Sequence, residues 1–257
     1  MADQSILELS QVVKRFGGLT AVDGVNFAVR RGQIKALIGP NGAGKTTVFN
    51  LVTGVYGVDG GEIRVAGRQT AGLPSHRVAA LGVARTFQHV ELFGNMSVLE
   101  NVMVGAHTQA SSGLLSCALR FGRMRSQERR LADKARQCLA LVGLERSPQD
   151  AEARALSFGQ QRLLEIARAL AAEPALLLLD EPAAGLSTAE SARLAELVLR
   201  IRDLGVTVLV VDHDMDLVMG ISDEVVVLDH GVRIAEGSPH DVQRDPKVVA
   251  AYLGEEV

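Results

Sequence analysis

The sequence contains only 2 cysteines, Cys117 and Cys138. They fit neither a framework of disulfides nor a cysteine-based metal site, and a reducing compartment is the default expectation. The formal net charge is −3, so the chain also lacks the excess of basic residues that a nucleic-acid-binding surface requires. We interpret the arginines of residues 120–130 as one solvated helix face. No nucleic-acid partner is therefore expected.

Long apolar runs are lacking as well. The longest, residues 175–179 and 206–211, fall far short of the roughly 18–20 residues that a membrane-crossing helix needs. Acidic residues follow both runs, which are typical of strands in a parallel sheet that is buried on both faces. Residues 1–5 lack a basic segment followed by an apolar one, so no secretory signal is expected. The sequence thus predicts a cytoplasmic location.

The remaining composition is that of a globular protein. Hydrophobic residues make up 47% of the 257 residues and charged residues 22%, which is enough apolar material for a sizeable core. This length is typical of one large domain, or of one domain that carries a smaller subdomain.

The N-terminal part predicts antiparallel strands. Apolar residues recur in residues 7–13, and alternation resumes in residues 25–30 after a turn signal at Asp23-Gly24. The apolar run 34–38 then leads into a glycine-rich loop, and helical spacing begins at Lys45. A strand, a loop and a helix in this order mark the start of a parallel α/β core. Another strand is expected at residues 61–67.

The middle of the chain changes character. Residues 98–170 show helical periodicity and almost no strand signal, with an amphipathic helix expected at 125–142. Strands are expected again at 176–179, 206–211, 225–228 and 233–236, separated by helices at 188–204 and 214–221. A last helix should begin at Pro246, after Asp245, and stop at Gly254. We therefore expect one domain, 1–257, with an α/β core (1–97 and 171–257) and an inserted α-helical subdomain (about 98–170).

Residues 39–47 match the phosphate-loop pattern G-x-x-x-x-G-K-[ST] in full. Its glycines let backbone N–H groups turn toward phosphate oxygens, and the following helix points its N-terminal dipole at the same charge. Lys45 would contact the β- and γ-phosphates, and the Thr46 hydroxyl would hold Mg²⁺. The predicted nucleotide-binding residues of this loop are Gly39, Asn41, Gly42, Gly44, Lys45, Thr46 and Thr47.

A second acidic pair follows the apolar run at 176–179. Asp180 and Glu181 should lie at the carboxyl end of that strand, where open α/β sheets bind ligands. Asp180 is predicted to hold Mg²⁺, and Glu181 to orient or deprotonate the attacking water. Combined with the phosphate loop, the pair predicts ATP hydrolysis with Mg²⁺.

Further motifs resemble those of the ATP-binding cassette (ABC) family, which implies a P-loop NTPase core with an N-terminal antiparallel β subdomain. The stretch Leu156-Ser157-Phe158-Gly159-Gln160 resembles the LSGGQ signature of these proteins. The resemblance identifies Gln88 as the Q-loop glutamine, His213 as the switch histidine and Phe16 as the aromatic residue that stacks on adenine. It covers nearly the whole chain, and the order of the motifs agrees throughout.

The resemblance also implies a mechanism. Ser157, Gly159 and Gln160 would contact the γ-phosphate of ATP bound by a second ABC subunit, in a homodimer or a heterodimer. Gln88 would sense Mg²⁺ and the attacking water, and His213 would hold the γ-phosphate and act in catalysis beside Glu181. Loss of the γ-phosphate would remove these contacts and open the dimer.

Three positions depart from the family pattern. Phe158 replaces the first glycine of the signature, while Ser157 and Gly159 remain. Ser187 replaces the usual D-loop aspartate, which puts a cross-dimer role there in doubt, and Phe16 replaces the commoner tyrosine.

Residues 84–102 and the ending 251–255 resemble the larger ATPase subunit of branched-chain amino-acid importers. This implies a peripheral protein on the cytoplasmic face of the inner membrane, with two transmembrane permeases and, indirectly, a periplasmic substrate-binding protein. Related cassettes for urea uptake or lipopolysaccharide export are the alternatives. A non-transport cassette is more remote, because residues 88–156 leave no room for a long coiled-coil insertion.

Overall fold

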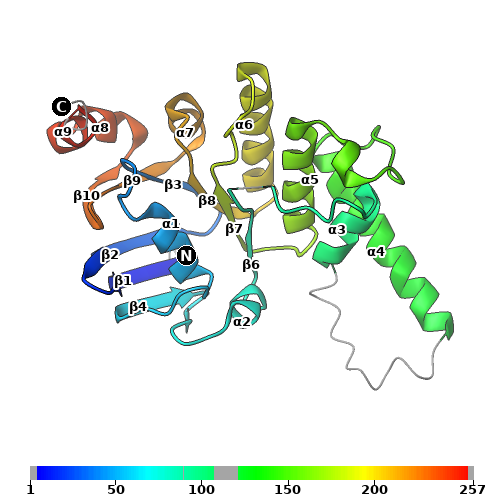
Figure 1. Cartoon of the computed structure of the whole chain (residues 1–257), viewed down its shortest axis with the longest axis horizontal. Helices are drawn as coiled ribbons and strands as arrows, with labels where there is room; N and C mark the ends of the chain where they lie inside the picture. Colours follow the sequence, from blue (N-terminus) through cyan, green and yellow to red (C-terminus); the bar gives the residue numbers. More distant parts are fainter. Residues whose placement is uncertain (1–4, 89, 107–120, 254–257) are drawn as a thin grey trace. The chain divides into compact units, whose positions relative to one another are not determined.

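The computed structural model describes residues 5–88, 90–106 and 121–253 (Figure 1). The contacts divide the chain into two compact units, one formed by Met1–Arg85 with Ala175–Val257 and the other by Thr86–Pro174. The helical segment expected at about 98–170 lies within the second unit, and its role as a functional subdomain stays a prediction. The expected stop at Gly254 lies outside the described residues.

A four-stranded antiparallel sheet opens the first unit, in the order β2-β1-β4-β5. Its strands are β1 (Ser5–Phe16), β2 (Leu19–Arg30), β4 (Gly60–Val65) and β5 (Arg68–Gln69). The prediction of a turn at Asp23-Gly24 was wrong, because the turn between β1 and β2 is formed by Gly17-Gly18. Gly24 lies within β2 at φ 61, where the β1–β2 register is irregular, so the turn signal reports a distortion inside the strand.

The second sheet of this unit has the order β10-β9-β3-β8-β7-β6, parallel except for β10 at its edge. Its strands are β3 (Ile34–Ile38), β6 (Val83–Arg85), β7 (Leu176–Asp180), β8 (Thr207–Val211), β9 (Glu224–Asp229) and β10 (Val232–Gly237). Every residue of β3, β7 and β8 is buried, as the uninterrupted apolar runs predicted. The short strand β6 was not expected.

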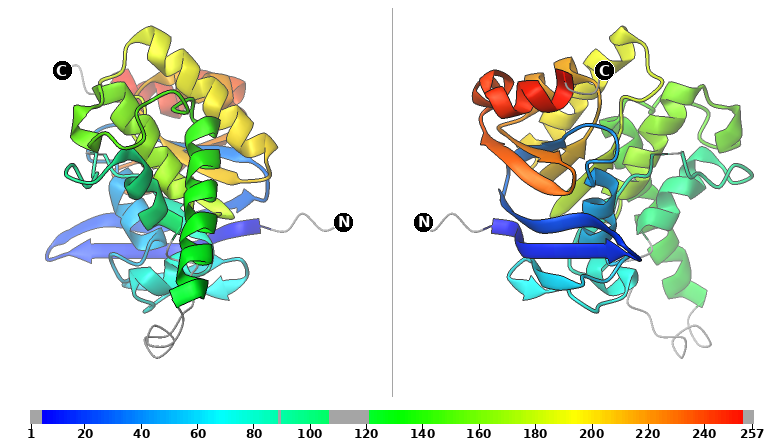
Figure 2. Two further views of the ribbon diagram at one scale, coloured as in Figure 1. Left: turned by 90° about the vertical axis from the view of Figure 1, so that its right-hand side faces the viewer. Right: turned by 60° about the vertical axis from the view of Figure 1, so that its left-hand side comes forward.

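Helices cover both faces of the parallel sheet. Helix α1 (Lys45–Val52) lies between the two sheets, and its Val48, Phe49 and Val52 join one apolar core with residues of both (Figure 1). Helices α6 (Thr188–Asp203) and α7 (Met215–Ile221) cover the other face (Figure 2). The remaining helices of this unit are α2 (Ser75–Ala79), α8 (Pro239–Arg244) and α9 (Pro246–Leu253).

The second unit is helical within the described residues. It contains α3 (Val98–Ala106), α4 (Phe121–Leu141) and α5 (Phe158–Leu170), which pack against one another, and a short 3-10 helix at Ala153–Ala155. The apolar side of α4 is buried as its periodicity predicted, at Ala135, Cys138 and Leu139. The part of the chain that the structure describes holds no helix long and apolar enough to cross a membrane.

Candidate functional site

The carboxyl ends of three neighbouring parallel strands gather the candidate residues of the first unit. Strand β3 leads into the loop 39–47, its neighbour β8 leads into His213, and β7 ends at Asp180 and Glu181. Because these strands are parallel and adjacent, the three segments emerge at the same edge of the sheet. The predicted nucleotide-binding and acidic residues are thus brought together by the sheet order.

The phosphate-loop candidate is shaped by close backbone contacts. A Cβ added at Gly39 (φ 149) would collide with the carbonyl oxygen of Leu228, and one at Gly44 (φ 99) would lie 2.5 Å from the Ala21 carbonyl oxygen. The Ala43 carbonyl accepts a hydrogen bond of 3.1 Å from the Gly231 N–H. Glycine is required at Gly39 and Gly44 because a neighbouring main chain occupies the space of a side chain.

Lys45 lies under this loop with only 7% of its surface exposed. Its Nζ donates hydrogen bonds to the Gly39 carbonyl at 2.6 Å and the Pro40 carbonyl at 2.8 Å. Thr46 is exposed and stands in the first turn of α1, where helix N–H groups lack intrahelical acceptors. A buried ammonium and a helix N-terminus at one loop make a site that attracts anions.

Asp180, at the end of β7, is 2% exposed and forms an ion pair with Arg85. The Arg85 Nη2 atom lies 2.7 Å from Asp180 Oδ2, and Nη1 donates to Asn50 Oδ1 at 2.6 Å. The Arg85 guanidinium also lies 5.5 Å from the centre of the Phe49 ring. Arg85 therefore fixes the candidate Mg²⁺ ligand relative to α1.

Glu181 and His213 contact each other directly. His213 Nε2 lies 3.1 Å from Glu181 Oε1, and Glu181 adopts a left-handed backbone conformation with φ 47. Its N–H donates to the Val211 carbonyl at 2.7 Å, which holds this bend against β8. Strained non-glycine residues of this kind gather at functional sites.

Asp212 joins the loop after β7 to the loop after β8. Its Oδ2 accepts a hydrogen bond of 2.8 Å from the Ala183 N–H, and its Oδ1 accepts one of 2.9 Å from the Asp214 N–H. Burial raises the pKa of Asp212, although the N–H groups of Asp214, Ala183 and His213 lower it. The loop after β7 is thereby fastened to the loop after β8.

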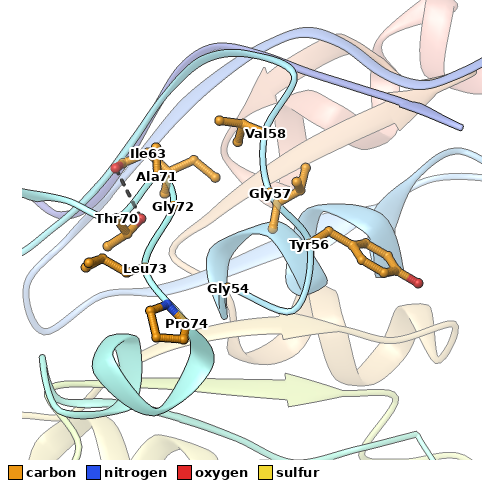
Figure 3. Close-up of a pocket in the computed structure, with 11 residues that line it drawn as sticks. Gly54, Tyr56, Gly57, Val58, Ile63, Thr70, Ala71, Gly72, Leu73 and Pro74 are labelled. Atoms are coloured by element: carbon orange, nitrogen blue, oxygen red, sulfur yellow. Dashed lines mark hydrogen bonds between the residues drawn. The ribbon is translucent and has the colours of Figure 1, made fainter.

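Phe16 ends β1 and is 42% exposed. Its ring meets that of Tyr56 edge to face, with centroids 5.2 Å apart, and Lys14 Nζ lies over the same ring at 5.3 Å from its centre. Tyr56 also borders a cavity of about 280 Å³ between the end of α1 and the segment after β5 (Figure 3).

The signature candidate lies in the second unit, at the start of α5. Ser157 is the N-cap: its Oγ accepts from the Gln160 N–H at 3.4 Å, and Gln160 Oε1 accepts from the Ser157 N–H at 3.1 Å. This capping box gives Gln160 a structural partner within its own helix turn. Ser157 and Phe158 are exposed at the helix N-terminus.

Gln88 belongs to the same unit and is exposed. Its carbonyl accepts a hydrogen bond of 3.0 Å from Arg162 Nη2. Glu165 Oε1 accepts one of 3.0 Å from the Phe87 N–H, and burial raises the pKa of Glu165 although this N–H and Arg162 lower it. The backbone at Gln88 is thus held by side chains of α5.

Sequence reasoning missed four supporting residues: Arg85, Arg162, Glu165 and Asp212. Asp212 offered a signal, since it is an acidic residue directly after an apolar strand, as Asp180 is. Arg162 and Glu165 offered a weaker one, as opposite charges three positions apart in a predicted helix. Arg85 offered none, because its partner lies 95 positions away.

Comparison with known proteins agrees with this arrangement. A family model described as ABC transporter matches residues 22–184. A second model, described as branched-chain amino acid ATP-binding cassette transporter, matches residues 232–257.

Curated relatives match over almost the full length. The high-affinity branched-chain amino acid transport ATP-binding protein LivG of Salmonella typhimurium is 45% identical over 98% of this chain and 99% of its own. The corresponding protein BraF of Pseudomonas aeruginosa is 46% identical over 97% of this chain and 98% of its own. A solved ABC transporter cassette in its ADP conformation is 34% identical, with a TM-score of 0.85 over 97% of this chain and 99% of that one.

Proposed function

The chain belongs to the ABC transporter family and is an ATPase of that family; from this premise we propose that it energises the import of branched-chain or related hydrophobic amino acids. The names of its full-length relatives support this substrate class. The observation that supports the catalytic part is the contact of 3.1 Å between Glu181 and His213, at the sheet edge from which the phosphate loop also emerges.

ATP occupies the loop 39–47 in this proposal. Lys45 exchanges its carbonyl partners, Gly39 and Pro40, for β- and γ-phosphate oxygens, and the first N–H groups of α1 bind the same phosphates. Phe16 stacks on the adenine. Gly39 and Gly44 keep the loop in shape because their neighbours exclude a side chain.

The oxygen donors fit Mg²⁺. Mg²⁺ is commonly held by one or two carboxylates together with substrate phosphates, and Asp180 with Thr46 supplies a carboxylate and a hydroxyl in this way. When bound, the ion neutralises charge on the phosphate oxygens. Gln88, the Q-loop glutamine by resemblance, is proposed as a further Mg²⁺ ligand and as the residue that senses the bound ion.

Glu181 accepts the proton of the attacking water, or orients that water by accepting its hydrogen bond. Without ATP, His213 Nε2 holds the Glu181 carboxylate in one orientation. With ATP bound, we propose that the same nitrogen donates to the γ-phosphate instead. Asp212 keeps the two residues in register, because it fastens their loops together.

The active form is a dimer with a second ABC subunit. The N-terminus of α5, with Ser157 and Gly159, contacts the γ-phosphate of the nucleotide that the other subunit binds. The dimer works with two transmembrane permeases on the cytoplasmic side of the membrane, and a substrate-binding protein delivers the amino acid to them.

The decisive variant is Glu181→Gln. We expect it to retain ATP binding and to lose roughly 100-fold or more of the hydrolysis rate, because a general base contributes about 10²–10⁴-fold. It should also accumulate as a dimer with ATP in size-exclusion chromatography. Glu196→Gln, at an exposed position of α6, is the matched control and should behave as the wild type. Wild-type turnover in Glu181→Gln would remove Glu181 from the mechanism.

The substrate class requires a separate measurement. The tagged chain is purified from its native membranes, reconstituted with the permeases that accompany it, and assayed for ATP hydrolysis with a binding protein loaded with leucine, isoleucine or valine. Stimulation by these amino acids supports the proposal. Stimulation by urea, or co-purification with lipopolysaccharide-export components, would contradict the proposed transport of amino acids. The proposed ATPase chemistry would remain unchanged.

A further inference from the structure

Two buried charged residues of α5 hold the main chain at Gln88. Arg162 and Glu165 are each 1% exposed, and Arg162 Nη1 lies 3.2 Å from Glu165 Oε2. The guanidinium donates to two successive carbonyls, that of Phe87 at 2.8 Å and that of Gln88 at 3.0 Å. Glu165 Oε1 accepts from the Phe87 N–H at 3.0 Å. Three main-chain groups of Phe87 and Gln88 are therefore bound by two side chains of one helix.

The buried pair of Arg162 and Glu165 is an inefficient way to raise the free energy of unfolding. Two charges must be desolvated, and an apolar pair of similar volume is often neutral or more favourable for stability. The Nε atom of Arg162 is also buried without a hydrogen-bond partner among the described residues. The planar guanidinium instead provides what an apolar residue does not, namely two N–H donors in fixed geometry toward two carbonyls.

The same guanidinium also reaches the signature. Its Cζ lies 5.8 Å from the centre of the Phe158 ring, at a distance where the cation and the aromatic face attract each other. Phe158 is 48% exposed and directly follows the N-cap residue Ser157. One buried side chain therefore connects the exposed signature residue that departs from the LSGGQ pattern with the backbone of Gln88.

We propose that Arg162, supported by Glu165, is a positioning residue that sets the place of Gln88 and couples it to the signature. When the nucleotide of a second subunit contacts the N-terminus of α5, the Phe158 ring, the Arg162 guanidinium and the Gln88 backbone then shift together. The proposal rests on the proposed function and adds to it two residues that touch neither nucleotide nor water. It also gives Phe158 a role that a glycine at that position could not have, because glycine has no ring to contact the guanidinium.

The main test removes the charges without leaving one of them unpaired. The double variant Arg162→Met/Glu165→Met should fold, with a loss of thermal stability that reflects the three main-chain groups of Phe87 and Gln88 left without these partners. We expect its ATPase kcat to fall on the order of 10- to 100-fold, as a misplaced catalytic group does. The Mg²⁺ concentration for half-maximal activity should rise severalfold, as in Gln88→Ala, while Mg²⁺-free ATP binding by the first unit stays unchanged.

Arg162→Lys keeps the charge beside Glu165 but loses the two-pronged donor geometry. It should fold and show the same direction of shift in Mg²⁺ dependence. Arg154→Lys is the control, since Arg154 is an exposed arginine of the same unit whose side chain pairs with Glu152. Its Mg²⁺ dependence should equal that of the wild type.

A second readout does not depend on hydrolysis. In the Glu181→Gln background, the double variant should need severalfold more Mg²⁺-ATP to dimerise. Wild-type Mg²⁺ dependence and dimerisation in both Arg162 variants would overturn the inference, as would wild-type behaviour of Gln88→Ala. Failure of the proposed function looks different, because the wild-type chain and Arg154→Lys would then also lack Mg²⁺-dependent ATPase activity.

Discussion

The Asp212 carboxylate accepts a hydrogen bond from the Ala183 N–H at a distance of 2.8 Å. The bond joins the loop after β8, which carries His213, to the loop after β7, which carries Glu181. Asp212 is 3% exposed, and its second oxygen accepts from the Asp214 N–H at 2.9 Å. The contact between Glu181 and His213 therefore depends on a third residue that carries no catalytic role itself.

Asp212→Asn tests this dependence. An asparagine has one acceptor oxygen, so one of the two N–H donors loses its partner and faces an NH₂ group, which costs about 1–3 kcal/mol of the free energy of unfolding. We expect kcat to fall because the Glu181–His213 geometry loosens. Urea denaturation and steady-state kinetics measure both effects, and an unchanged kcat would show that the two loops do not need this link.

The pH dependence of stability has a definite sign. Burial raises the pKa of Asp212, so the folded chain binds more protons than the unfolded chain just above the ordinary carboxyl pKa of about 3.9. The contribution of Asp212 to stability is thus fully present below that value and is lost as the pH rises through the raised pKa. The stability difference between wild type and Asp212→Asn should be larger near about pH 4.5 than near about pH 7.5.

Two glycines of the phosphate loop should differ sharply in their tolerance of a methyl group. At Gly39 the added Cβ would collide with the Leu228 carbonyl, whereas at Gly42 (φ 79) nothing lies within 4 Å. Gly39→Ala should therefore prevent a native loop and ATP binding. Gly42→Ala should fold, at a cost of about 1–2 kcal/mol for its left-handed conformation. Thermal unfolding of the pair decides this, and equal losses would contradict the described packing.

Arg85→Met leaves the Asp180 carboxylate buried without its ion pair. Breaking a buried pair costs about 3–5 kcal/mol, so a large loss of stability is expected. Mg²⁺-ATP should restore more stability to this variant than it adds to the wild type, because the metal supplies positive charge to the same carboxylate. Arg64→Met is the control: its pair with Glu62 has side chains 45% and 47% exposed, and its loss should cost less than about 1 kcal/mol.

Ser157→Ala separates helix capping from phosphate binding. Ser157 caps α5, and Ser238 caps α8 in the same way, with Oγ accepting from the Asp241 N–H at 3.2 Å. Each alanine substitution should cost about 1 kcal/mol of stability. Only Ser157→Ala should lower the ATPase rate of the dimer. Equal activity losses in the two variants would indicate that Ser157 acts through its helix alone.

Local patterns were sufficient for much of the fold. The apolar runs at β3, β7 and β8 predicted fully buried strands, and Pro246 after Asp245 predicted the start of α9. Such features depend on neighbours within a few residues, which a sequence displays directly. The phosphate loop and the Asp180-Glu181 pair were predicted from local sequence patterns of the same kind.

Other features depend on the fold. Strand β6 has three residues, too few for any periodicity, and it is a strand because β7 lies beside it. The Asp23-Gly24 turn signal failed because β2 accommodates an irregular register there. The partners of Arg85 and Arg162 lie 95 and 75 positions away, and only the assembled units bring them into contact.

Strands β6 and β7 also mark where Thr86–Pro174 leaves and rejoins the rest of the chain. The Gly82 carbonyl accepts hydrogen bonds from the Ala175 and Leu176 N–H groups, at 2.8 and 3.0 Å. Exit and return are thus neighbours in one sheet, separated along it by about 10 Å, the length of three strand residues. The segment is therefore an insert with adjoining ends, and any segment that replaced it would have to cross back over the same parallel strand pair.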